Sequence, residues 1–355
     1  MNNHLKKNKT FLSLIIIILL AGISSPFWVW RTLPKKIVSI TIIDKTVDDE
    51  NYREHTGLVW ALNHLKVQKQ HAVRYEDAAD FYKEIPDFQK ENLPKIIYLA
   101  DTYGVETVKE NNRVVVEGGI ATEEVNRLRN AVLTGKTNLI AEFNTFASPT
   151  EREAREELSN LLHLKWSGWI GRYFSDLNSK EVPVWVKRNY KEQYGDWKHQ
   201  GAGMLFVHEN GEMIIIEEKD MREKGAMFRF TKQGETVYHL KASVPYPYWF
   251  DIIKPLNKQE VMANYELKLT QSGKEKLMKQ DIPFTFPAII HHQNETYHSL
   301  YFAGDYADQS ELPGIYQTWG FSWIRQHVVL DDGNGNTFYW KVYLPLMKTL
   351  LTRFS

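Results

Sequence analysis

Three apolar, strand-like runs of this sequence each lead directly into a carboxylate. The residues that follow these runs are, in chain order, Asp44, Asp101 and Glu142. Because the ligand crevice of a parallel sheet lies outside the carboxyl ends of its strands, these side chains meet if the strands are neighbours. Paired carboxylates perform general acid and base chemistry on glycosidic bonds, or bind sugar hydroxyls. We therefore predict a catalytic group here, with helix or turn capping as the alternative for each residue.

Other polar side chains follow the same runs and are predicted to share the crevice. His55, Tyr103 and Asn144 lie shortly after the first, second and third carboxylates. Asp305 follows a later strand-like run, 298–303, and is predicted either to join the crevice or to form a turn. We treat these residues as candidate ligand-binding groups.

Aromatic residues gather in the second half of the chain, notably at 166–174 and 246–251. Tryptophan rings stack on the apolar faces of sugars, while neighbouring charged groups bind hydroxyls. This combination predicts carbohydrate contacts by Trp166, Arg172 and Trp249. The alternative is that these rings only pack the core, as most aromatic side chains do.

Composition excludes several classes of function. The 355 residues include 44 Lys and Arg, 44 Asp and Glu, and no cysteine. Zero net charge gives no electrostatic reason to expect a nucleic acid partner. Without cysteine there is no disulfide, no thiolate nucleophile and no thiolate-bound metal. The histidines at 291, 292 and 298 have no recognised zinc spacing, so neither a metal nor another cofactor is predicted.

Residues 11–30 form an uncharged apolar run that is long enough to cross a membrane core of about 30 Å. Trp28 and Trp30 suit the headgroup boundary at its end. Small residues at 21–25 leave a cleaved signal peptide as the alternative. Basic residues on the two sides nearly balance, and the short basic tail 1–10 is typical of the cytoplasmic end of a signal anchor. We predict a single-pass anchor with an extracytoplasmic body.

The order of predicted elements indicates an α/β protein with a doubly wound, mostly parallel sheet. In the first part of the body, 36–164, strands are predicted at 37–43, 95–99, 113–116 and 137–141, and helices at 55–65, 122–133 and 151–162. An inserted antiparallel segment, 165–283, is predicted to hold strands at 182–186, 203–207, 213–217, 226–230, 236–242 and 263–269. The last part, 284–355, is predicted to return to the first domain through strands at 286–291 and 298–303 and helices at 314–327 and 342–352.

This order resembles the class I glutamine amidotransferase-like superfamily, which has a Rossmann-like fold. The similarity rests on Gly118-Gly119 before a helix, the segment 135–142, and the return strands 286–291 and 299–305. It covers 36–150 and about 284–327. Members of that family use a Cys–His–Glu triad, so this chain without cysteine cannot carry amidotransferase chemistry. The resemblance implies the fold and a degenerate, non-hydrolytic role, like that of amidotransferase-like modules accompanying carbohydrate-active proteins.

The function expected from these patterns is binding, assembly or processing of a cell-envelope polysaccharide by a membrane-anchored protein. One alternative is a glycan hydrolase that uses paired carboxylates. Another is a structural subunit of an envelope complex whose aromatic clusters contact other envelope proteins.

Overall fold

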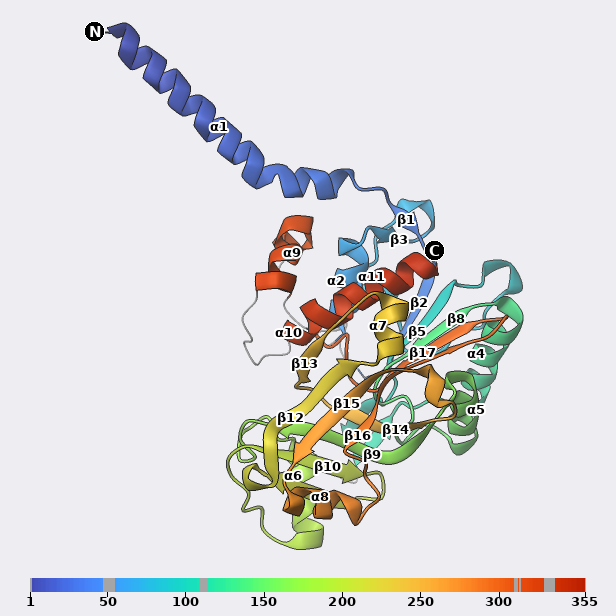
Figure 1. The fold of residues 1–355 in the computed structure, drawn as a ribbon. Helices are drawn as coiled ribbons and strands as arrows, with labels where there is room; N and C mark the ends of the chain where they lie inside the picture. Colours follow the sequence, from blue (N-terminus) through green and yellow to red (C-terminus); the bar gives the residue numbers. More distant parts are fainter. Residues whose placement is uncertain are drawn as a thin grey trace.

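The computed structural model describes residues 2–46, 55–108, 114–309, 312, 314–328 and 336–354 (Figure 1). Its centre is a nine-stranded mixed sheet with the order β13-β12-β15-β16-β17-β8-β5-β2-β4. In that order the strands are β13 (Ser243–Tyr246), β12 (Met221–Phe230), β15 (Val261–Leu269), β16 (Thr285–Gln293), β17 (His298–Phe302), β8 (Asn138–Ala141), β5 (Ile96–Asp101), β2 (Ile40–Asp44) and β4 (Phe81–Tyr82).

Strand direction divides this sheet into two halves. From β4 to β17 the neighbouring strands run parallel, and from β17 to β13 they run antiparallel. The expected mostly parallel sheet is therefore present in one half only. The antiparallel half includes β12, β13 and β15, which come from the segment 165–283 and extend the main sheet.

A second, four-stranded antiparallel sheet is formed by the rest of the segment 165–283. Its order is β11 (Met213–Glu217), β10 (Gly203–His208), β9 (Leu164–Phe174) and β14 (Phe250–Pro255). The backbone N–H of Asp251 in β14 donates to the carbonyl of Ala303, which directly follows β17, at 3.1 Å. This contact joins the second sheet to the middle of the main sheet.

Helices cover the sheets, and Figure 1 shows α4 and α5 together on one side of the parallel strands, with α2 beside α11 on the other. The α-helices are α1 (Asn2–Thr32), α2 (Thr56–His64), α3 (Asp77–Asp80), α4 (Thr122–Gly135), α5 (Arg152–Leu162), α6 (Val184–Tyr194), α7 (Lys232–Tyr238), α8 (Gln271–Met278), α9 (Trp319–Val328), α10 (Asn336–Phe338) and α11 (Leu344–Arg353). Two small sheets remain, the parallel pair β1 (Lys36–Ile37) and β3 (Val67–Gln68), and the hairpin β6 (Val105–Val108) and β7 (Val114–Glu117). The predicted strand 113–116 corresponds to β7, and residue 113 lies outside the described residues.

Two predicted strands are helical instead. The segment predicted as a strand at 182–186 contains the start of α6, with Pro183 at its N-cap position. The segment predicted at 236–242 overlaps α7, where the Thr231 hydroxyl accepts a hydrogen bond from the N–H of Gly234. The Thr231 hydroxyl thus satisfies a free N–H group in the first turn of α7, and the fixed φ of Pro183 suits the start of α6.

The N-terminal helix α1 carries the apolar run. Its part Phe11–Thr32 is long and apolar enough to cross a membrane, and no residue of its most apolar stretch is buried. A membrane anchor and a signal peptide both have this form.

Candidate binding site at the carboxyl edge of the parallel strands

The predicted carboxylates come together because their strands are neighbours. Asp44 at the end of β2 lies opposite Asp101 at the end of β5, and Glu142 directly follows β8, the next strand. Asp44 and Glu142 are fully buried and Asp101 is 4% exposed. Apolar strand residues place all of them at one edge of the sheet, as expected for parallel strands.

His55, at the start of α2, bridges two carboxylates of this edge. Its Nδ1 lies 2.9 Å from Oδ2 of Asp44, and its Nε2 lies 3.1 Å from Oδ1 of Asp305. Burial alone would lower the pKa of His55, but the two carboxylates outweigh it and raise that pKa well above 6.5. An imidazolium held between Asp44 and Asp305 offsets their charge. The structure thus brings two predicted ligand-binding residues, His55 and Asp305, into the carboxylate group.

Asp101 holds the loops that follow β5 and β8. It accepts hydrogen bonds from the N–H of Tyr103 at 2.8 Å and from the side-chain amide of Asn144 at 3.0 Å. Asn144 has a left-handed backbone with φ of 67°, a conformation that asparagine tolerates better than most residues. Burial raises the pKa of Asp101 to about 7, with Asp305 and Asp44 adding to the effect and His55 opposing it.

Glu142 binds the loop that follows β17 and the Tyr98 hydroxyl. It accepts hydrogen bonds from the Tyr98 hydroxyl and from the N–H groups of Tyr306 at 2.7 Å and Ala307 at 3.0 Å. Burial is the main cause that raises its pKa to about 8. These contacts fix the loop that carries Asp305, so Glu142 acts on this edge by positioning its neighbours.

Asp251 on β14 completes the group and was not predicted as a site residue. It is 1% exposed and accepts a hydrogen bond from the Tyr301 hydroxyl. Burial is the main cause that raises its pKa to about 7, and the charge of Asp101 contributes to this rise. The sequence does contain a sign of this buried acid, because Asp251 lies between apolar residues of the strand Phe250–Pro255. An acid rarely lies in such a run without a partner.

The capping alternative also holds for these residues. Asp44 accepts a hydrogen bond from the N–H of Thr46 at 3.1 Å, and Asp101 binds the N–H of Tyr103. Both are turns in which an aspartate binds the backbone two residues further along the chain. Asp44 and Asp101 therefore fix the backbone of the loops at this edge.

A pocket of about 210 Å³ lies between these loops and the second sheet. Tyr103 and the segment 147–148 form one wall, while β9, β10 and α6 form the other. Aromatic and polar side chains face it, namely Tyr103, Trp166, Trp185, Asn189 and His208. Trp166, one of the predicted ligand-binding residues, lines this pocket, as do Trp185 and His208, which were not predicted.

Two other predicted ligand-binding residues do not line this pocket. Trp249 stacks on Trp185 with ring centroids 6.1 Å apart, so it supports a pocket wall from behind. Arg172 lies further along β9 than Trp166. Its guanidinium lies 4.9 Å from the centre of the Phe174 ring.

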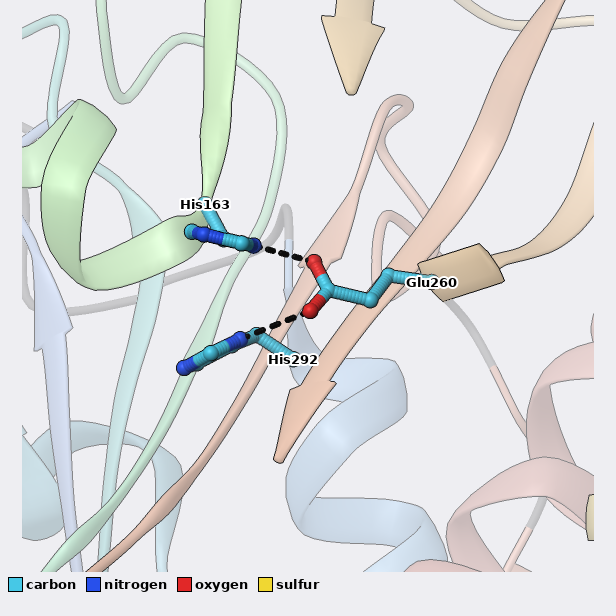
Figure 2. A group of neighbouring side chains, drawn as sticks. All are labelled: His163, Glu260 and His292. Atoms are coloured by element: carbon cyan, nitrogen blue, oxygen red, sulfur yellow. Dashed lines mark hydrogen bonds and ion pairs between the residues drawn. The ribbon is translucent and has the colours of Figure 1, made fainter. Parts of the chain in front are cut away.

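A second polar group lies at the opposite, amino-terminal end of β17. His163, Glu260 and His292 come from the end of α5, the turn before β15 and the end of β16 (Figure 2). Glu260 accepts from Nδ1 of both histidines, at 2.9 Å for His292. Two nitrogens and a carboxylate, all within 4.8 Å of one another, are a ligand set that suits zinc and related ions.

Hydrogen bonds account for this group without an ion. Oδ1 of Asn294 accepts the N–H groups of Thr296 and Tyr297, so its amide nitrogen faces Nε2 of His292 at 3.2 Å. His292 therefore contacts Glu260 through Nδ1 and Asn294 through Nε2. His291 points to the other face of β16 and contacts His298 and Tyr238. This agrees with the expected alternation of the adjacent histidines.

Comparisons with known proteins add little to this geometry. No protein-family model and no curated protein matches the chain. Among solved structures, the carbohydrate deacetylase Agd3 aligns with a TM-score of 0.33 and 7% identity, over 76% of this chain and 30% of that one. The exo-β-1,4-mannosidase Op5Man5 from Opitutaceae bacterium strain TAV5 aligns with a TM-score of 0.34 and 9% identity, over 86% of this chain and 36% of that one.

A putative ThuA-like protein from Bacteroides uniformis ATCC 8492 aligns with a TM-score of 0.34 and 11% identity, over 83% of this chain and 95% of that one. This chain spans about a third of the deacetylase and of the mannosidase. Similarity at this level supports no conclusion about activity.

The buried acids predict a pH dependence of stability. The folded-state pKa values are about 7 for Asp101, 8 for Glu142 and 7 for Asp251, all above the ordinary values of 3.8 and 4.5. Between those limits the folded chain binds more protons than the unfolded chain, so its stability falls as pH rises. His55 acts in the same direction, because its raised pKa stabilises the folded chain below 6.5 and this contribution is lost as pH rises further.

The free energy of unfolding should therefore decrease from pH 5 to pH 8 in denaturant titrations. Glu142→Gln should reduce this difference by roughly 3 kcal/mol, because the amide does not ionise. Glu156→Gln is the matched control, since the Glu156 side chain is 69% exposed. Stability that rises with pH, or an unchanged difference in Glu142→Gln, would contradict this account.

Proposed function

We propose that this chain is a membrane-anchored, extracytoplasmic protein that binds a cell-envelope polysaccharide. Helix α1 would be the anchor, and the short basic tail before it would stay in the cytoplasm. A sugar ring of the polysaccharide would lie in the pocket between the carboxyl edge of the parallel strands and the second sheet.

The pocket is the observation that carries this proposal. Tyr103, Trp166 and Trp185 offer aromatic surface, while Asn189 and His208 offer hydrogen-bonding groups. Apolar C–H faces of a sugar pack on aromatic rings, and its hydroxyls bind polar side chains. A volume of about 210 Å³ suits a single ring of a longer glycan.

Binding is favoured over hydrolysis because most carboxylates at this edge already serve protein partners. Asp44, Glu142 and Asp251 are at most 1% exposed and hydrogen-bond to side chains or backbone. Similarity to the class I glutamine amidotransferase-like superfamily is part of this proposal at the level of fold. The absence of cysteine rules out the nucleophile of that family.

A glycan hydrolase is the second candidate, and the state of Asp101 favours it. This residue is 4% exposed and has a pKa raised to about 7. A carboxyl group that keeps its proton near neutral pH can act as a general acid. Asp305, with a side chain 19% exposed, would be the second carboxylate.

Pocket variants test polysaccharide binding. Trp166→Ala and Trp185→Ala should weaken retention of the chain on immobilised bacterial envelope glycans about 5- to 30-fold, as expected when an aromatic anchor is truncated. Trp197→Ala is the control, because this ring belongs to the same segment but does not line the pocket. Unchanged retention in both pocket variants, with normal unfolding curves, would remove the pocket as the binding site.

Product analysis decides between binding and hydrolysis. If the hydrolase candidate is correct, the unaltered chain shortens the glycan on prolonged incubation, and Asp101→Asn abolishes this product while retention persists. The amide keeps the shape of the side chain but cannot donate a proton as an acid. Retention without any product from the unaltered chain would exclude hydrolysis of the glycans tested.

Orientation can be tested because the chain has no cysteine of its own. Val184 is 80% exposed at the start of α6, so Val184→Cys offers a single reactive thiol. On intact cells this thiol should react with a membrane-impermeant reagent. Protection on intact cells, followed by labelling after lysis, would place the body in the cytoplasm.

A further inference from the structure

Helix α9 presents an apolar surface that the polysaccharide pocket does not explain. Its residues Trp319, Phe321, Trp323, Ile324 and Val328 are between 42% and 60% exposed. So many large apolar side chains on one short helix indicate a contact surface, because isolated exposed residues are the usual pattern.

This helix packs against the apolar helix α1. Gly320 lies directly against Pro26 of α1, where an added Cβ would be 2.5 Å from Cβ of the proline. Proline inside a helix removes a hydrogen bond and bends the helix, and Figure 1 shows α9 next to the bent end of α1. The apolar face of α9 therefore lies next to the part of α1 that is long enough to cross a membrane.

A groove of about 570 Å³ lies between the end of α1, α9 and α11, and residues of all three helices line it. Trp30, Trp319 and Trp323 line it together with Lys66 and Lys348. The ring of Trp30 is fixed, because its Nε1 donates to the carbonyl of His64 at 2.8 Å and the Nζ of Lys66 lies 3.3 Å from the ring centre.

Positive charge gathers at this groove. Burial lowers the pKa of Lys66, and the neighbouring charges of Arg74, Arg31 and Lys35 lower it further. Lys348, on α11, lies close enough to act electrostatically on His64 in the same groove. A concentration of cations beside tryptophan rings is typical of a surface that meets anionic headgroups.

We propose that α9 and this groove form a docking surface for an anionic phospholipid bilayer. The apolar face of α9 lies in the boundary between headgroups and acyl chains, and the lysines of the groove bind a headgroup phosphate. This inference rests on the proposed membrane anchor, since α1 is what holds α9 at the bilayer. It adds a second contact that keeps the body against the membrane surface.

A single labelled cysteine at each of three positions tests the docking surface in the full-length chain, reconstituted in lipid nanodiscs. Ile324→Cys on α9, labelled with an environment-sensitive fluorophore, should show blue-shifted emission and several-fold weaker quenching by aqueous iodide. Ile18→Cys reports on α1 itself. Val184→Cys, at the start of α6, is the control and should stay fully quenched.

The three labels separate the two proposals. If Ile18→Cys is protected and Ile324→Cys is quenched like the control, the anchor stands and the docking surface is wrong. If both are quenched, the anchor and the docking surface both fail. Protection of Ile324→Cys without protection of Ile18→Cys would contradict the anchor on which this inference rests.

Lipid composition tests the headgroup contact. Protection of the label at Ile324→Cys should be stronger in discs containing phosphatidylglycerol than in discs of phosphatidylcholine alone. Combining Lys66→Gln with Lys348→Gln should remove this difference and leave protection at Ile18→Cys unchanged. A difference that persists without both lysines would overturn headgroup binding in this groove.

Discussion

Burial of several carboxylates at one edge of a sheet is the constraint on which this structure depends. Ionised acids are expensive to remove from water unless they are paired or protonated. The chain uses both solutions, since His55 bridges Asp44 and Asp305, while Asp101 and Glu142 have raised pKa values. The loops beyond β2, β5 and β17 have their observed form because these acids bind their backbone N–H groups.

The same hydrogen bonds also position residues that line the pocket. Asp101 fixes the backbone at Tyr103, whose side chain lines the pocket, and holds Asn144 beside it. Glu142 binds the N–H groups at 306 and 307, next to Asp305. The carboxylates of this edge therefore hold a loop that forms one wall of the pocket.

The parallel half of the fold and its edge residues could be predicted from sequence, because alternating strands and helices followed by acids indicate a crevice. Asp44, Asp101 and Glu142 do lie together, joined by His55 and Asp305. The pocket wall formed by Trp185 could not be predicted, since the residues around it read as a strand but belong to α6. The pairing of β12 and β15 with the main sheet could not be predicted either, because hydrophobic alternation does not show which sheet a strand joins.

The position of β17 has a consequence for folding. This strand, His298–Phe302, lies between β16 and β8, so it separates the two halves of the main sheet. Its parallel partner β8 ends at Ala141, more than 150 residues earlier, and pairing over such sequence distances is slow. The parallel and antiparallel halves can meet only after nearly the whole chain has been synthesised, so earlier intermediates expose the unpaired edges of β8 and β16.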